Sequence, residues 1–319
     1  MENCINGAKS LIDKQVKLNK IKNTGVAFDG YQKVYGWTNE NIKAYLDSVD
    51  FNGKDSALSV MASGDQAFNL INKGILNIDT FDTNMLTEYY VFGLKRAMIL
   101  KYNYKEFIFY MEKLISKTTD IDEISSIIFD LLPYMDEKHR LFWSTIVDYN
   151  LKVQKINYTN LNLLHMLLIG INIKSNYLYF NNYLENEEQY NILRNNLAKA
   201  NLTFKQANAY HLDQKFHKKY DFIILSNILD YFTNYFGNNW DYMKLKEYEE
   251  KLSFLTKEDG VVFLKYILLY ATDNYTREIL FRGARVESSD LTDEKIIKIK
   301  QCSATSAVNI YDGMILKRF

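Results

Sequence analysis

The chain alternates between strand-like and helix-like hydrophobic patterns. The run from Ala57 to Ala62 is almost wholly apolar, which is typical of a strand buried on both faces of a parallel sheet. Ser63-Gly64-Asp65 interrupts it, a short amphipathic helix follows, and a second strand ends at Asp82. Similar alternation returns in the last third, where we expect strands at 202–207, 219–226 and 261–270 and a helix at about 240–255. These elements predict a doubly wound α/β sheet.

The middle third of the chain has a helical period and no convincing strand. We expect helices at 85–101, 104–115, 122–132, 137–151, 158–169 and 186–200. Pro133 is expected to end the third of these, because proline cannot continue a helix. About a hundred residues of helix therefore separate the second and third strands, which predicts a large helical insertion at this point.

The two ends of the chain carry weaker patterns. A loose helix is expected at 8–22, and the aromatic stretch that begins at Tyr31 either forms a lid over a ligand or packs the N-terminal helices onto the core. Near the other end we expect a short helix at 276–282 and two short strands, 307–311 and 314–317. Asp312-Gly313 between those strands is a strong hairpin dipeptide.

Composition narrows the possible functions. The 319 residues include 39 basic and 39 acidic side chains, and this balance argues against general binding of nucleic acid or anionic membranes. Cys4 and Cys302 have no metal-ligand spacing, so no metal site is expected and a reducing cytoplasm is the simplest location. We find neither a signal peptide nor an apolar run long enough to span a membrane. A small or lipid-like partner is expected, and the oligomeric state is left open.

The residues at the first turn and at the second strand end indicate an adenosine site. Gly64 can adopt a positive φ, which allows the backbone to turn tightly or to approach a ligand. Asp82 lies roughly 20 residues further on, at the end of the next strand, where nucleotide-binding α/β folds place a carboxylate against ribose hydroxyls. The repeated glycines of a dinucleotide fingerprint are missing, which disfavours NAD.

The succession of strands and five short blocks extend this interpretation. Five strands in α/β alternation followed by a terminal hairpin match the layout of the S-adenosylmethionine-dependent methyltransferase fold. The blocks resemble those of a bacterial family, long described as a domain of unknown function, whose relatives include the betaine-lipid synthase that transfers a 3-amino-3-carboxypropyl group from S-adenosylmethionine to diacylglycerol. The blocks are Tyr35–Ile42, Ser63–Asn69, Asp82–Asn84, Tyr104–Phe107 and Leu225–Tyr231.

The resemblance implies a domain layout. It comprises an N-terminal helical lid at 1–50, the first part of a Rossmann-like domain at 51–101, a helical insertion at 102–200 and the second part of the domain at 201–319. The cofactor implied is S-adenosylmethionine. A single glycine, Gly64, stands where the methyltransferase pattern usually has several, which is a departure at the methionine-binding turn.

The resemblance also implies site residues. Ser63, Gly64 and Asp65 would line the methionine end of the cofactor, with Asp65 pairing with its ammonium group. Asp82 and Asn84 would bind the ribose region. The remaining candidates lie after the third and fourth expected strands. They are Asn208 for the adenine, Ser226 for the cofactor, and Asn227, Asp230 and His211 as catalytic candidates on the acceptor side.

Several of these residues have a structural alternative. Asp82 and Asp230 could each cap a helix, because aspartate is a preferred N-cap residue. Asn208 could belong to a turn, and His211 could be an exposed loop residue. For the whole chain the leading interpretation is a methyltransferase acting on a small molecule. Aminocarboxypropyl transfer and a nucleotide-binding module without catalysis stay open as alternatives.

Overall fold

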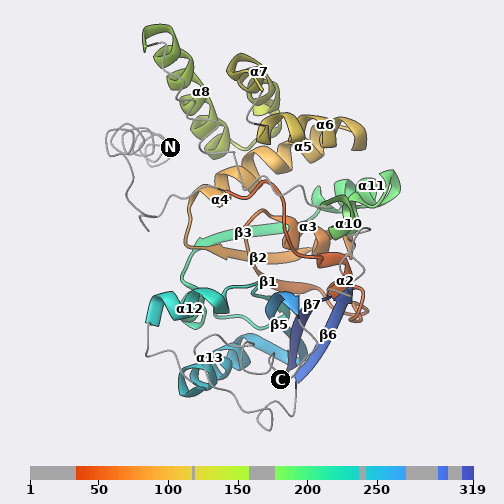
Figure 1. The fold of residues 1–319 in the computed structure, drawn as a ribbon. Helices are drawn as coiled ribbons and strands as arrows, with labels where there is room; N and C mark the ends of the chain where they lie inside the picture. The colour runs from red at the N-terminus through yellow and green to blue at the C-terminus, as the bar shows by residue number, and fades with distance from the viewer. Residues whose placement is uncertain (1–33, 117–118, 158–176, 237–241, 271–293, 301–310) are drawn as a thin grey trace.

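The computed structural model describes residues 34–116, 119–157, 177–236, 242–270, 294–300 and 311–319. A seven-stranded sheet with the order β3-β2-β1-β4-β5-β7-β6 runs through the molecule (Figure 1). The strands are β1 (Ser56–Val60), β2 (Asn77–Asp82), β3 (Asn201–Gln206), β4 (Tyr220–Ile224), β5 (Thr256–Tyr270), β6 (Glu294–Lys300) and β7 (Tyr311–Arg318). Strands β1 to β5 pair in parallel, and β7 is antiparallel to both of its neighbours. The predicted methyltransferase-like fold class is confirmed by this order.

Two hydrophobic cores lie on the two faces of the sheet. Ala57 of β1 belongs to one core and the next residue, Leu58, belongs to the other. The first core also contains α2 (Ile42–Leu46), α3 (Asp65–Asn72) and α11 (Glu187–Leu197), whereas the second contains η4 (Ala209–Gln214), α12 (Leu229–Phe236) and α13 (Tyr242–Leu255). Strands buried on both faces explain the nearly continuous apolar runs in the sequence.

The described part of the segment between β2 and β3 contains helices and short turns but no strand, and it rises from one side of the sheet (Figure 1). Before α11 it contains α4 (Leu86–Glu88), η1 (Tyr89–Lys95), α5 (Arg96–Lys101), α6 (Tyr104–Ile115), α7 (Ile121–Leu131), η2 (Leu132–Tyr134), α8 (Glu137–Asn157), α10 (Tyr177–Phe180) and η3 (Asn182–Leu184). Helix α7 ends before Pro133, as predicted. The helix expected at 158–169 lies outside the described residues, and the domain boundaries stay predictions.

The predicted hairpin at Asp312-Gly313 is wrong. Both residues lie inside β7, where Gly313 is opposite Ile267 of β5 and Lys298 of β6. A strand between two others satisfies backbone hydrogen bonds on both of its edges, which outweighs the local turn preference of the dipeptide. The short helix expected at 276–282 and residues 307–310 of the expected strand lie outside the described residues.

Strand β5 contains a turn signal of its own. Tyr220 of β4 pairs with Thr256, but Phe222 pairs with Val261, so β5 carries extra residues between the two contacts. Asp259 has a φ of 60° at this irregularity. The extra residues therefore form a bulge within the strand.

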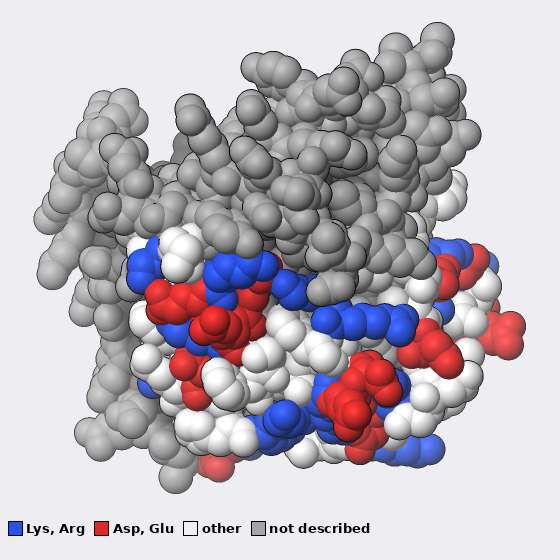
Figure 2. All heavy atoms as spheres, turned by 90° about the horizontal axis from the view of Figure 1, so that it is seen from below, with Lys and Arg blue, Asp and Glu red and all other residues white. Residues whose placement is uncertain are grey.

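Charges on the described surface are mixed. In Figure 2 acidic and basic side chains lie next to one another on the visible, described part of one face. Helix α13 carries pairs of this kind, with Glu247 within 2.7 Å of Lys244 and 2.9 Å of Lys251. No helix in the described ranges is both long and apolar enough to cross a membrane.

Candidate functional site

The carboxyl ends of β1 and β4 meet at the switch point of the sheet. Strands β2 and β3 continue the sheet on one side of β1, and β5 continues it on the other side of β4. Open α/β sheets bind ligands in the crevice at such a point. Ala62 follows β1 with a φ of 42°, and Ser226 follows β4 with a φ of 59°. Left-handed backbone costs a non-glycine residue about 1–2 kcal/mol and concentrates at functional sites.

A tight turn connects β1 to α3. Gly64 has a φ of 81° and immediately precedes the first residue of α3. A Cβ atom on Gly64 would lie only 2.4 Å from Cγ1 of Val91 and 3.2 Å from the ring of Phe68. Both the backbone conformation and the contact with η1 therefore require glycine, as the sequence predicted for the conformation alone.

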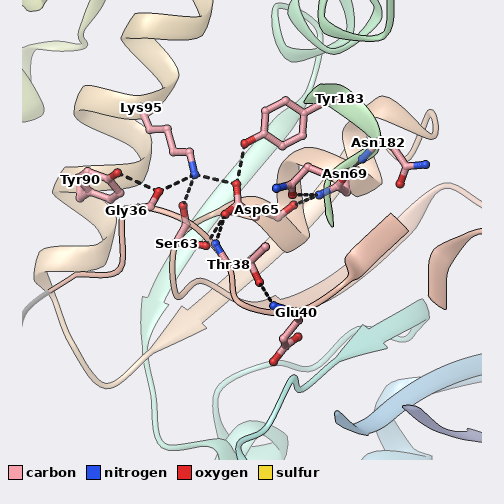
Figure 3. Close-up of polar contacts among 11 residues, drawn as sticks. Gly36, Thr38, Glu40, Ser63, Asp65, Asn69, Tyr90, Lys95, Asn182 and Tyr183 are labelled. Carbon is pink, nitrogen blue, oxygen red and sulfur yellow. Dashed lines mark hydrogen bonds and ion pairs between the residues drawn. The ribbon is translucent and has the colours of Figure 1, made fainter. Parts of the chain in front are cut away.

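Both oxygens of the Asp65 carboxylate accept hydrogen bonds from other residues of the protein (Figure 3). Its Oδ1 accepts hydrogen bonds from Lys95 Nζ at 2.7 Å and from the Tyr183 hydroxyl at 2.6 Å. Its Oδ2 accepts from the Thr38 backbone N–H at 2.6 Å and from Ser63 Oγ at 2.7 Å. The sequence analysis predicted that Asp65 pairs with the ammonium group of a ligand. In this structure Asp65 pairs instead with the ammonium group of Lys95.

Lys95 is a site residue that the sequence analysis missed. Its side chain is fully buried, and its Nζ also donates to the carbonyl oxygens of Gly36 at 3.1 Å and Ser63 at 3.0 Å. The same Nζ lies 4.5 Å from the centre of the Trp37 ring. Burial lowers the pKa of Lys95 and the neighbouring Asp65 charge counteracts the shift. The only signal in the sequence was the Lys95-Arg96 pair in the middle of a mostly apolar helix.

Local helix geometry and the insertion bring these groups together. Lys95 is the last residue of η1, a π-helical stretch inside the continuous helix that spans Leu86–Lys101. Tyr183 lies near the C-terminal end of the insertion. Its neighbour Asn182 donates its backbone N–H to the side chain of Asn69 on α3 at 2.6 Å. π-Helical turns are rare and recur at functional sites.

Asp82 connects the ends of β1 and β2. Its Oδ2 accepts from the Ala62 N–H at 3.1 Å, and its Oδ1 accepts from the Asn84 N–H at 2.9 Å. Burial raises the pKa of Asp82 to about 6, while the backbone N–H groups of Asn84, Ala62 and Thr83 act in the opposite direction. Asn84 itself accepts from the Leu86 N–H at 3.1 Å and so shapes the start of α4.

Glu40 is the second missed residue, and it reaches the switch point from the N-terminal segment. The Ser226 hydroxyl donates a short hydrogen bond to Glu40 Oε1, and Gln66 Nε2 lies 3.4 Å from Oε2. The Glu40 side chain is buried. Glu40 belongs to the Tyr35–Ile42 block, so the resemblance was the only signal that could have found it.

The contacts of the other predicted site residues are local. Asn208 accepts from the Tyr210 N–H at 2.9 Å, so it forms the turn that starts η4. Asn227 Oδ1 lies 3.4 Å from Ser226 Oγ. His211 packs edge-on against Tyr210, with ring centres 5.4 Å apart. Asp230 lies in the first turn of α12, and its side chain is outside the described part of the structure.

Within the described residues, no group of three or more His, Cys, Asp or Glu side chains could hold a metal ion. The polar groups at the switch point are carboxylates, amides and hydroxyls held by backbone N–H groups and by each other. This arrangement can accept hydrogen bonds from hydroxyls and can compensate a cationic group.

Comparisons with known proteins find similarity only at the level of structure. No family model and no curated protein matches the chain. Precorrin-8W decarboxylase of Methanobacterium thermoautotrophicum is 12% identical, with a TM-score of 0.32, over 92% of this chain and 100% of its own. The glycopeptide N-methyltransferase MtfA in complex with S-adenosyl-L-methionine is 8% identical, with a TM-score of 0.35, over 92% of this chain and 100% of its own. Its sinefungin complex gives 8% and 0.33 over 90% and 96%.

Proposed function

We propose that this protein is an S-adenosylmethionine-dependent transferase, most simply a methyltransferase that acts on a small molecule. One observation carries the proposal: the turn after β1, Asp82 at the end of β2 and Ser226 after β4 converge at the switch point of the sheet. Direct contacts connect them, because Ala62 bonds to Asp82 and Glu40 bridges Ser226 to the first turn of α3. Nucleotide ligands bind at such a point.

The proposed cofactor contacts follow from the chemistry of each group. Asp82 accepts backbone N–H groups on both of its oxygens, and its remaining acceptor capacity suits a ribose hydroxyl. Asn84 supports this contact from the same turn, and Asn208 offers its side-chain amide to the adenine. Ser63 and Gly64 form the backbone turn against the methionyl part, with Asp65 holding that turn through Lys95.

The acceptor side is assigned to the end of β4. Ser226, Asn227 and Asp230 follow that strand directly, and His211 lies on η4, which packs against the same face as α12. When bound, S-adenosylmethionine supplies a carbon activated by its sulfonium, so the reaction needs little help from a base. The residues at the end of β4 then have to orient the acceptor, and proximity and orientation can contribute roughly 7–11 kcal/mol.

Calorimetric titration with S-adenosylmethionine and S-adenosylhomocysteine tests the proposal. We expect saturable binding by the wild-type protein and a loss of affinity of about tenfold or more in Asp82→Ala, because a ribose hydroxyl loses its acceptor. Asp79→Ala is the matched control, since Asp79 lies on the same strand but bonds to Tyr220 and Thr203. Absence of binding at millimolar ligand would refute the proposal.

The products distinguish the two transfer reactions. Methyl transfer leaves S-adenosylhomocysteine, whereas aminocarboxypropyl transfer leaves methylthioadenosine. Mass spectrometry after incubation with candidate small or lipid-like acceptors identifies which of the two accumulates. Binding without either product, together with unchanged biological activity of Asp82→Ala, would instead support a non-catalytic nucleotide-binding module.

Cofactor affinity is expected to depend on pH through Asp82. Its pKa is raised from the ordinary 3.8 to about 6, so its contribution to stability is present at low pH and is lost as the pH rises through 6. Ribose hydroxyls favour the ionised acceptor, so affinity should rise severalfold between about pH 5 and 7. Titration with methylthioadenosine, which has no amino-acid group, measures this. Asp82→Asn should remove the dependence, and an unchanged pH profile in that variant would contradict the assignment.

A further inference from the structure

The π-helical stretch η1 contacts two different parts of the molecule. Val91 packs against the turn after β1, where its Cγ1 lies 2.4 Å from the position that a Cβ on Gly64 would take. Lys95 donates from its Nζ to the Ser63 carbonyl oxygen of the same turn at 3.0 Å. Val91 and Lys95 are four residues apart, so they lie on one side of the helix. This side of η1 holds the turn against which the proposed function places the methionyl part of the cofactor.

Helix α8 of the insertion contacts η1 through other residues. The indole Nε1–H of Trp143 donates to the Tyr89 carbonyl oxygen at 2.9 Å, and the Trp143 side chain is fully buried. The Tyr89 ring stacks on Phe142, with ring centres 3.8 Å apart. Gly93 permits this close approach, because a Cβ at that position would lie only 2.8 Å from Trp143 Nε1. Tyr89 and Gly93, the residues of η1 that meet α8, are again four residues apart.

The hydrogen-bond register of η1 connects these two sets of contacts. The Arg96 N–H donates to the Val91 carbonyl oxygen five residues earlier, which is the π pattern. A π turn contains one residue more than an α turn, so it changes the direction of the side chains that follow it. Relaxation to the α register would turn Lys95 relative to Tyr89 by roughly 100°, the angle that one residue spans in an α-helix. The ion pair of Lys95 with Asp65 therefore depends on this register.

We propose that Trp143 is a positioning residue for the cofactor site, an inference that rests on the proposed function. Its hydrogen bond to Tyr89 keeps η1 in the π register, and η1 in turn holds Lys95 against Asp65 and Ser63. π turns are rare, so a tertiary contact is needed to retain one inside a longer helix. Coupling between distant sites travels through contiguous packed elements of this kind. The helical insertion thereby contributes to cofactor affinity through η1.

Calorimetry with S-adenosylhomocysteine and amide hydrogen exchange test the role of Trp143. Trp143→Phe retains an apolar ring but removes the indole N–H. We expect the affinity of this variant to fall about three- to tenfold, because part of the free energy of one buried hydrogen bond is lost from the site. Amide exchange, followed by mass spectrometry without ligand, should become faster in residues 61–69 as well as in α8, because the turn loses its support from Lys95.

Ile146→Ala is the matched control on α8. Ile146 is fully buried about one turn after Trp143, and its truncation should lower the melting temperature at least as much as Trp143→Phe. It should nevertheless leave the affinity within about twofold of wild type and the exchange of residues 61–69 unchanged. Gly93→Ala disturbs the same contact from η1, since the new methyl group meets the indole, and it should reproduce the pattern of Trp143→Phe.

The two measurements separate failure of this inference from failure of the proposed function. Equal affinities in Trp143→Phe and Ile146→Ala would overturn the role of Trp143 while the function stands. A loss of affinity in Trp143→Phe without faster exchange in residues 61–69 would contradict the route through η1. If the wild-type protein does not bind S-adenosylhomocysteine, the proposed function falls, and with it the role of Trp143 in cofactor binding. The exchange comparison then still decides whether α8 controls the turn, because it needs no ligand.

Discussion

Replacing Lys95 with methionine is expected to lower the free energy of unfolding by about 3–5 kcal/mol, because the change leaves the Asp65 charge buried without its cation. Both side chains of the pair are fully buried, and Lys95 also donates to Gly36 and Ser63. Methionine retains most of the volume, so loss of packing is a minor part of the effect. Urea unfolding followed by circular dichroism measures the change.

A second substitution tests the cause. In Asp65→Asn combined with Lys95→Met no charge is left buried, so the double variant should lose less stability than the sum of the single variants. Lys73→Met is the matched control, because Lys73 pairs with Asp47 at 2.6 Å with both side chains partly exposed, and it should cost less than about 1 kcal/mol. Equal unfolding midpoints for Lys95→Met and Lys73→Met would contradict the assigned role of the pair.

Replacing Gly64 with alanine is expected to cost about 2–5 kcal/mol of stability and to weaken cofactor binding. Two causes add up: left-handed backbone costs alanine about 1–2 kcal/mol, and the new methyl group overpacks against Val91 and Phe68 at a further 1–3 kcal/mol. Thermal unfolding gives the first quantity and calorimetry with S-adenosylhomocysteine gives the second.

Gly74 provides the control for this experiment. It has a φ of 95° but nothing lies within 4 Å of an added Cβ, so Gly74→Ala should show the backbone cost alone and no effect on binding. The stability cost of Gly64→Ala should be smaller in a Val91→Ala background than in the wild-type protein, because the shorter side chain leaves room for the new methyl group. If Gly64→Ala and Gly74→Ala are equally stable, the contact with η1 does not constrain the turn.

The fold was predictable because its signals are local. Strands buried on both faces show as short apolar runs, and α7 ends where Pro133 imposes a stop. The hairpin prediction at Asp312-Gly313 failed for the opposite reason. The outcome there depended on β5 and β6, which pair with the two edges of β7 and which a dipeptide preference does not take into account.

The sequence by itself determined the doubly wound sheet, the glycine turn after β1 and the place of Asp82 at the end of β2, since each depends on neighbours along the chain. Only the tertiary structure decided which groups the buried acids meet. Asp65 contacts residues 30 and 118 positions away, and Glu40 contacts a residue 186 positions away. A buried charge takes its partner from whatever the fold brings near it, and hydrophobic periodicity contains no information about that partner.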